Sequence, residues 1–370
     1  MIKSSGSRTN LTPARDFNYP WADIKIMKGL PDSLKFDEDF QDVKHITDGS
    51  NAHIYLAKFE GKTVIIKMLK EKFQHSKAVI REFDTEYCCL IRLNHPNIIK
   101  VLGAGRNPRR FMVMEYLSGG TLQSLLHNQD TGRASLATRF LHQGVFRSRA
   151  FTYTQALKNM KDLASALLYL HDQVQEGVTI VHRDLKPDNI GFTENGVLKL
   201  FDFGLCTCIQ SRKVPTDTYA MTGGTGSIRY MAPEVAKKES YTELVDVYSF
   251  SILAWQMIKD KLPFMGMNKT LFIMEVVRKG VRPKIDPSWP LQLSSLLQSC
   301  WNADRMQRPS FKDVVQQIDQ LIAEDAENNR SKEKKGGGFL GLGIGSPLSS
   351  PSKKVARAKP APSKSESSWF

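Results

Sequence analysis

The sequence has 370 residues, of which 41% are hydrophobic and 24% are charged, a balance that allows a sizeable core to be buried. Its five cysteines do not fit a disulfide framework, and Cys206 and Cys208 lack a second ligand pair at zinc-like spacing. The formal net charge is +14, but lysine and arginine are dense near the C-terminus, so we expect much of the excess in a flexible end.

No apolar run approaches the ~20 residues of a membrane span, and the first residues lack the apolar segment of a secretory signal. The start of the chain bears Ser and Arg and has a faint likeness to an organelle transit peptide. We nevertheless expect a cytoplasmic protein, with the nucleus as the alternative, and do not expect organelle targeting.

The first part of the chain is predicted to pass from a loose segment into strands. Residues 1–37 lack sustained periodicity and are predicted to form a flexible leader. From Val43 onward short strands are favoured. Residues 54–59 and the β-branched segment 63–69 are predicted as two strands, joined by a turn at 60–62.

A helix is predicted at Lys77–Leu93, because apolar residues recur there at helical spacing. The residues that mark its apolar face are Ile80, Phe83, Tyr87 and Leu90. Glu86 lies at the edge of the same face. Two further strands are predicted at Ile98–Leu102 and Phe111–Glu115.

Beyond Gly120 the patterns become mainly helical, with Thr121 as the expected N-cap of the next helix. Later helices are predicted at Gln155–His171, Glu243–Ile258, Leu291–Cys300 and Phe311–Ile322. Strands followed by helices indicate an α+β fold with a small sheet-rich lobe and a larger helical lobe.

Two polar segments stand apart from this pattern. Residues 129–150 are Arg-rich without periodicity and are predicted to be an inserted loop. Residues 327–370, with a triple glycine, Ser-Pro steps and scattered lysines, are predicted to be a disordered basic tail. Its aromatic residues, Phe339 and Trp369–Phe370, are too few to interleave with bases, so nucleic acid is not expected as a partner.

The most specific chemistry lies in three motifs in the second half of the chain. Residues 182–189 read HRDLKPDN, residues 202–204 read DFG after an apolar run, and residues 231–234 read MAPE. In this order the motifs resemble those of the eukaryotic protein kinase family. The resemblance covers residues 38–326.

This resemblance implies the bilobal protein kinase fold. The N-lobe, residues 38–117, is expected to hold a small antiparallel sheet and one main helix, and the C-lobe, residues 118–326, is expected to be mainly helical. Within the family, the chain looks most similar to the tyrosine-kinase-like group of Ser/Thr kinases. That likeness is carried by Trp301, the RPSF element at 308–311 and the run at 226–234.

The resemblance implies that ATP and Mg²⁺ are the cofactors and that the γ-phosphoryl group moves to Ser or Thr hydroxyls of protein substrates in intracellular signalling. Asp184 resembles the catalytic aspartate that accepts the hydroxyl proton. Lys186 places a cation where the charge of the transferring group must be balanced, and a lysine at this position follows the Ser/Thr pattern. Asn189 and Asp202 are hard oxygen ligands suited to Mg²⁺.

Nucleotide-binding residues follow from the same resemblance. Lys67 closes a VIIK strand and resembles the lysine that holds the α- and β-phosphates. Glu86 is its expected partner, because an unpaired buried charge is costly. Met114 stands at the gatekeeper position, where its bulk narrows the rear pocket, and the backbone groups of Glu115 and Leu117 are expected to meet adenine.

The phosphate-covering loop departs from the family pattern G-x-G-x-x-G-x-V. Residues 47–54 read TDGSNAHI, so that only Gly49 is kept, Ala52 replaces the third glycine and Ile54 takes the last position. Ile65 adds bulk where the family has a small residue. The departure leaves an alternative open, a pseudokinase or scaffold module with weak or no phosphoryl transfer.

Three further residues resemble structural elements of the family. Glu234 and Arg308 are expected to form a buried pair that holds the activation segment to the helical lobe, and Asp246 is expected to anchor the catalytic loop.

The segment between the DFG and MAPE motifs is the expected place of regulation. Thr222 or Thr225 is predicted as the phosphorylated switch, modified by an upstream kinase or by the chain itself, and the phosphate could pair with Arg183. Ser227 occupies the position at which the family usually has a structural threonine.

Overall fold

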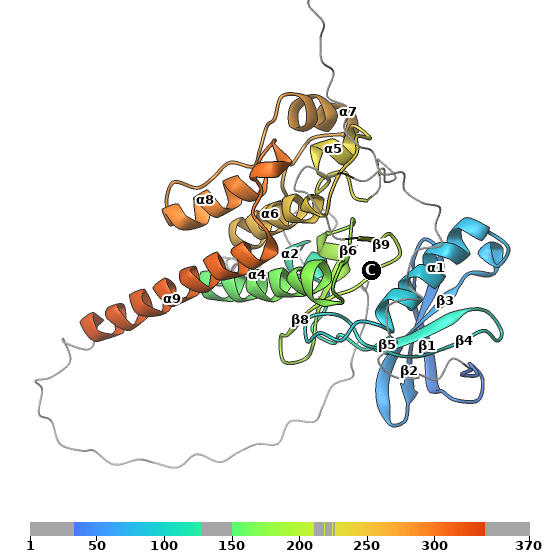
Figure 1. Cartoon of the computed structure of the whole chain (residues 1–370). Helices are drawn as coiled ribbons and strands as arrows, with labels where there is room; N and C mark the ends of the chain where they lie inside the picture. The colour runs from blue at the N-terminus through green and yellow to red at the C-terminus, as the bar shows by residue number, and fades with distance from the viewer. Residues whose placement is uncertain (1–32, 128–149, 211–217, 219–223, 225, 337–370) are drawn as a thin grey trace, which may run out of the picture.

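The computed structural model describes residues 33–127, 150–210, 218, 224 and 226–336. Figure 1 shows a sheet-rich lobe in blue and cyan beside a larger helical lobe in green to red. The α+β prediction with two lobes is therefore confirmed. Within these residues no helix combines the length and the apolar character needed to cross a membrane.

The N-lobe is built on a five-stranded sheet in the order β1-β2-β3-β5-β4, and every neighbouring pair is antiparallel. The strands are β1 (Gln41–Asp48), β2 (Ala52–Phe59), β3 (Lys62–Leu69), β4 (Val101–Gly105) and β5 (Phe111–Glu115). The predicted strands at 54–59, 63–69 and 111–115 are present. The strand predicted at Ile98 begins later, because Ile98 instead forms an isolated parallel bridge with Leu200 of the C-lobe, through hydrogen bonds from the amide of Ile99 and to the carbonyl of Asn97.

Strand β3 shows how the sheet positions the site. Val64, Ile66 and Met68 pack into a small cluster on one face, whereas Ile65 and Leu69 belong to the main core on the other. Because successive side chains of a strand point to opposite faces, Lys67 shares the face of its odd-numbered neighbours.

The start of the N-lobe differs from the prediction. Phe36 packs with its ring centroid 5.9 Å from that of Phe111 and 5.3 Å from that of Tyr55. The amide of Leu34 donates to the carbonyl of Ala104 at 3.0 Å. Residues 33–37 therefore belong to the lobe, and the boundary predicted at residue 38 falls too late because aromatic packing is not visible in local periodicity. The remainder of the predicted leader lies outside the described residues.

One main helix, α1 (Lys77–Leu90), covers the sheet and follows a short 3₁₀ turn η1 (Glu71–Phe73). It ends three residues before the predicted Leu93, where the chain turns toward Pro96. Its buried face includes Phe83, Glu86 and Leu90. The helix therefore brings a carboxylate to the interior of the lobe.

The C-lobe is mainly helical, as predicted. Its α-helices are α2 (Leu122–His127), α4 (Tyr153–Leu168), α5 (Pro233–Ala236), α6 (Leu244–Lys259), α7 (Lys269–Phe272), α8 (Leu291–Cys300) and α9 (Phe311–Gly336). The 3₁₀ and π-helical turns are η2 (Tyr169–Gln173), η3 (Pro187–Asn189), η4 (Ile273–Arg278) and η5 (Arg305–Gln307). The expected cap is present, since Thr121 Oγ1 accepts from the amide of Ser124 at 3.1 Å. Helix α6 is buried from Leu244 to Ile258 and forms the centre of the lobe.

The last helix, α9, is longer than predicted. It continues to Gly336 rather than ending at Ile322, and so it includes the first residues of the segment predicted as a tail. Residues 323–335 combine good helix formers with acids followed by bases, an order that suits the helix dipole. Thr154 of α4 donates to Asp325 at 2.5 Å, which extends the docking of α9 beyond its apolar stripe. Residues 337–370 and 128–149, which include nearly all of the predicted insert, lie outside the described residues.

Two small strand pairs flank the HRDLKPDN and DFG motifs of the sequence. Strand β6 (Val178–Val181) pairs with β9 (Thr207–Gln210), and β7 (Ile190–Phe192) pairs with β8 (Leu198–Leu200). Strand β7 begins directly after the HRDLKPDN motif, and β8 ends just before the DFG motif. Their pairing therefore sets the two motifs side by side.

Candidate active site

A buried carboxylate holds the HRDLKPDN loop in place. Asp246 of α6 is fully buried and accepts from the backbone amides of His182 at 2.8 Å and Arg183 at 2.9 Å. Burial alone would raise the pKa of Asp246, but the hydrogen bond from His171 and the surrounding donors outweigh it and lower that pKa. Arg183 has a φ of 68°, a left-handed conformation that this anchoring stabilises. The predicted anchor is present.

The side chain of Asp184 is the centre of a hydrogen-bonded network. Lys186 Nζ lies 2.9 Å from Asp184 Oδ2, and Asn189 Nδ2 lies 3.2 Å from the same oxygen. Ser227 donates to Asp184 Oδ1 twice, through its amide at 2.9 Å and its hydroxyl at 3.1 Å. The carboxylate is thus fixed in orientation by groups from two separate segments.

A second charged cluster joins the two lobes. Lys67 Nζ of β3 lies 2.6 Å from Glu86 Oε2 of α1 and 3.5 Å from Asp202 Oδ1. Burial opposes the charge of Lys67, but the two carboxylates outweigh it and raise the pKa of this ammonium. The charge of Lys67 in turn lowers the pKa of Asp202. Burial raises the pKa of Glu86, and the charge of Lys67 opposes this rise. The predicted ion pair is present.

The DFG motif points its aromatic ring inward and leaves its carboxylate in the cluster. Phe203 is fully buried, and its ring centroid lies 4.8 Å from that of His182 in an edge-to-face contact. Asp202 has a φ of 63°, so the backbone turns sharply at the residue whose carboxylate faces Lys67.

A cavity of about 550 Å³ lies between the lobes and collects these groups, a size within the usual range for small-molecule sites. All of the site residues predicted from the sequence line it: Gly49, Ile54, Lys67, Glu86, Glu115, Leu117, Asp184, Lys186, Asn189 and Asp202. Met114 at the predicted gatekeeper position also lines the cavity.

The side chain of Glu115 is engaged outside the cavity. Its carboxylate pairs with Lys199 Nζ at 2.9 Å and accepts from the amide of Lys100 at 2.8 Å. The amide of Glu115 donates to the carbonyl of Lys100 at 3.0 Å. The hydrogen bonds to a planar ligand that the sequence predicted for Glu115 and Leu117 would therefore use the carbonyl of Glu115 rather than its amide.

The glycine-poor loop is held by a lysine. The amide of Gly49 donates to the carbonyl of Ala52 at 2.9 Å, which closes a tight turn. Lys70 Nζ donates to the carbonyl of Gly49 at 2.6 Å, and the amide of Lys70 donates to the carbonyl of Asn51 at 3.0 Å. The loop lacks two of the expected glycines, and these hydrogen bonds fix its position above the cavity.

Several lining residues were missed by the sequence assignment. Ser227 was placed only as a structural residue, although it contacts Asp184 directly; its spacing from Glu234 was the available signal. Gly191 also lines the cavity, and a Cβ there would lie 2.6 Å from Leu117 Cδ1. This glycine leaves room for Leu117, and no local sequence pattern marks it.

The arrangement suits an anionic ligand accompanied by a divalent cation. Lys67 and Lys186 supply cations at one end of the cavity. The amide nitrogen of Asn189 is used by Asp184, which leaves its Oδ1 as a hard oxygen donor. Together with the ionised carboxylate of Asp202, this oxygen fits Mg²⁺, which prefers carboxylate and carbonyl ligands.

Comparisons with known proteins agree with this site. The family described as protein tyrosine and serine/threonine kinase matches residues 40–318, which is more than half of the chain. The chain therefore belongs to this family. The sequence-based recognition, a Ser/Thr-type protein kinase most similar to the tyrosine-kinase-like group, is confirmed.

Curated relatives are about one-third identical to the chain over the aligned residues. Serine/threonine-protein kinase STY17 of Arabidopsis thaliana is 32% identical over 300 residues, which cover 81% of this chain and 47% of that protein. Serine/threonine-protein kinase VIK of the same plant is 33% identical over 287 residues, covering 76% and 60%. Human mitogen-activated protein kinase kinase kinase 7 is 32% identical over 295 residues, covering 78% and 43%. The chain thus spans about half the length of the relatives it matches.

Proposed function

We propose that this chain is an active protein serine/threonine kinase that transfers the γ-phosphoryl group of ATP, with Mg²⁺, to hydroxyl groups of proteins. One observation carries the proposal: a single cavity is lined by the Lys67–Glu86 ion pair, by the carboxylate of Asp202 and by Asp184, whose carboxylate is held by hydrogen bonds. The relatives named above as serine/threonine kinases support the same activity.

Each residue has a role in this proposal. Lys67, held by Glu86, orients the α- and β-phosphates of the nucleotide. Asp202 and Asn189 would hold the metal, which would supply positive charge to offset that of the phosphates. Asp184 orients the acceptor hydroxyl and accepts its proton, while Lys186 stabilises the charge that develops on the transferred group.

The adenine end of the cavity is built from apolar side chains and backbone. Ile54 and Gly49 cover the nucleotide from the N-lobe, and Glu115 and Leu117 offer backbone hydrogen bonds to the base. The gatekeeper Met114 closes the rear. This division leaves the charged residues for the phosphates.

Protein substrates with Ser or Thr acceptors, in intracellular signalling, are part of the proposal. Regulation is proposed at Thr222 or Thr225, through an upstream kinase or autophosphorylation; both residues lie outside the described residues. Arg183 would receive the phosphate. We further propose a cytoplasmic protein, with the nucleus as the alternative. Its kinase domain has the sequence-predicted bounds 38–326, extended at its start to include residues 33–37 and at its end to include the rest of α9, up to Gly336.

The alternative is a pseudokinase or scaffold module, which the glycine-poor loop favours. ATP turnover by the wild-type chain and by Asp202→Ala decides between the two, with Asp172→Ala as a control at an exposed aspartate. Activity in the wild type and in the control, lost in Asp202→Ala, supports the kinase. Equally slow turnover by all three proteins would favour the scaffold.

A further inference from the structure

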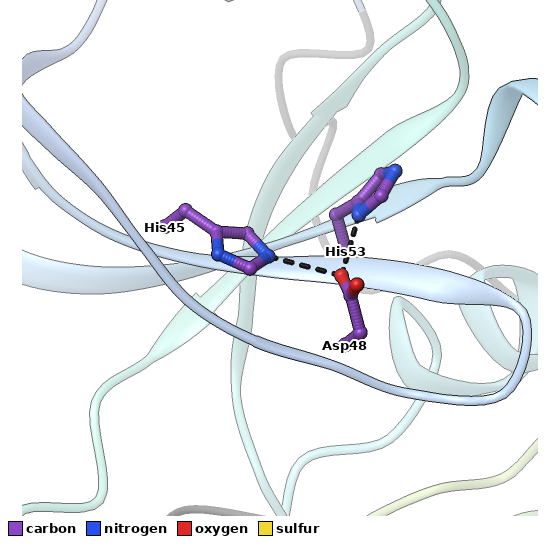
Figure 2. A group of neighbouring side chains, drawn as sticks. All are labelled: His45, Asp48 and His53. Carbon is purple, nitrogen blue, oxygen red and sulfur yellow. Dashed lines mark hydrogen bonds and ion pairs between the residues drawn. The ribbon is translucent and has the colours of Figure 1, made fainter. Parts of the chain in front are cut away.

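A histidine-rich cluster lies on the β1–β2 hairpin, outside the nucleotide cavity. In the part of the chain that the structure describes, one group of potential metal ligands brings three such atoms within 4.8 Å of one another, and it consists of His45, Asp48 and His53. Asp48 Oδ1 lies 3.0 Å from His45 Nε2 and 2.6 Å from His53 Nδ1 (Figure 2). Both imidazole rings therefore converge on one carboxylate oxygen.

The cluster depends on an irregularity in the hairpin. Residues 45 and 48 would point to opposite faces of a regular strand, because side chains alternate. The pairing of β1 with β2 shifts register between His45 and Thr47, and Asp48 then stands opposite His53. A shift of this kind re-aims the following side chain. The three ligands consequently gather on one side of the hairpin.

This side faces away from the nucleotide. Ile46 and Ile54 line the cavity, so their strand neighbours His45 and His53 project from the opposite face. The side chain of His45 is 47% exposed, that of His53 27% and that of Asp48 52%. A ligand at the cluster would be reached from solvent and would not compete with nucleotide.

We propose that His45, Asp48 and His53 form a binding site for a divalent transition-metal ion of the Zn²⁺ class. Two imidazoles and one carboxylate suit zinc, cobalt or nickel, whereas Mg²⁺ and Ca²⁺ prefer oxygen ligands alone. Zinc bonds of 2.0–2.2 Å at tetrahedral angles separate neighbouring ligand atoms by about 3.3 Å. The carboxylate oxygen lies 3.0 and 2.6 Å from the two ring nitrogens, and all three ligand atoms lie within 4.8 Å of one another. Their exposure lets them adjust to the metal spacing while water takes the fourth position.

The two imidazole rings can act as metal ligands in one of their tautomers. Each neutral ring can carry its proton on the other nitrogen, His45 on Nδ1 and His53 on Nε2, which frees the lone pair that faces Asp48. No oxidant or further reactant is required.

A bound metal would join the two ends of the loop that covers the cavity. Asp48 immediately precedes Gly49, and His53 immediately follows Ala52. A metal would replace the hydrogen bond between Asp48 and His53 with two coordination bonds and so restrain the tight turn between them more firmly. The Gly49–Ala52 hydrogen bond and Lys70 also hold this turn. The site would stiffen the segment in which the family's glycines are missing.

Calorimetric titration of the tag-free chain with Zn²⁺ near pH 7.5, in excess Mg²⁺ and without nucleotide, tests the site. The wild type should bind one equivalent that the doubly substituted His45→Ala/His53→Ala chain lacks. Loss of an outer partner of a metal ligand weakens binding by about 10–100-fold, so loss of a direct ligand in Asp48→Ala should exceed ~100-fold. His75→Ala, at an exposed histidine outside the cluster, should bind like the wild type.

Two further measurements keep the test independent of folding and of other ligands. Co²⁺ should give the visible absorption of a low-coordinate nitrogen–oxygen site in the wild type and not in the double variant, while both melt at the same temperature without metal. Hydrogen exchange of residues 49–52 should slow when Zn²⁺ is added. Equal Zn²⁺ binding by wild type and double variant would overturn the site, and unchanged exchange in the metal-bound chain would overturn its coupling to the loop.

Discussion

Removing one half of the buried Glu234–Arg308 pair should destabilise the C-lobe strongly. Arg308 Nη1 lies 2.6 Å from Glu234 Oε1, and Nη2 lies 3.0 Å from Oε2, a two-point contact. The side chain of Arg308 is 0% exposed and that of Glu234 is 7% exposed. Glu234→Ala would leave the guanidinium charge buried without its partner, which costs about 3–5 kcal/mol.

This cost converts into a measurable shift. At roughly 2–4 °C per kcal/mol for a domain of this size, Glu234→Ala should lower the melting temperature by about 6–20 °C. Lys161→Ala is the matched control, because the Lys161–Asp319 pair spans 2.5 Å with side chains 41% and 48% exposed. Exposed pairs contribute no more than about 1 kcal/mol. Thermal melts followed by circular dichroism compare the two variants.

A double variant separates charge from packing. Glu234→Leu with Arg308→Met removes both charges and should recover part of the loss, because a buried pair replaced by apolar residues is often neutral. If Glu234→Ala melts within the range of the Lys161 control, or if the double variant melts far below Glu234→Ala, the buried charge is not the source of the effect and the reasoning is refuted.

Three further predictions concern the site. Glu86→Gln keeps the shape but removes the charge that holds Lys67, so kcat/KM for ATP should fall by roughly 100-fold in steady-state assays; an unchanged value would contradict the role of the pair. Ser227→Ala removes one hydrogen bond to Asp184 and should lower kcat by about tenfold, whereas Ser227→Thr should keep it; equal rates for the two variants would argue against that contact. Burial lowers the pKa of His182 from its ordinary value of 6.5, so the unfolded chain takes up this proton first and the free energy of unfolding should fall as the pH drops below about 6.5, by up to about 1.4 kcal/mol per pH unit until the folded histidine titrates. Urea titrations between about pH 7.5 and pH 5 should show this slope in the wild type and a smaller slope in His182→Asn.

Much of the fold was accessible from local patterns. Phe111–Glu115 and Leu291–Cys300 have the predicted bounds, because a short apolar run and an amphipathic run each carry their own signal. The predicted bounds are wrong where contacts between residues far apart in the sequence determine the structure. The amide of Ile99 bonds to the carbonyl of Leu200 instead of extending β4, and Phe36 joins the N-lobe through aromatic rings that lie far away in the sequence.

The site divides in the same way. The HRDLKPDN and DFG strings predicted the residues that line the cavity, because their order and spacing are specific. Ser227 and Gly191 reach the site through tertiary contacts, to Asp184 and to Leu117, that no local pattern encodes. The His45–Asp48–His53 cluster depends on a register shift between β1 and β2. Strict alternation of side chains would place His45 and Asp48 on opposite faces of the sheet, so the sequence alone does not predict this cluster.

The most direct test of the account is phosphoryl transfer from ATP and Mg²⁺ to a generic basic protein and to the chain itself, with phosphosites mapped. Wild type is compared with Asp184→Asn, which keeps the shape of the side chain and removes its charge, and with the control Asp172→Asn. The account predicts Ser or Thr labelling by wild type and control and none by Asp184→Asn. Labelling by all three proteins would contradict the role of Asp184, and labelling by none, even after treatment with an upstream kinase from a cell extract, would contradict the kinase activity itself.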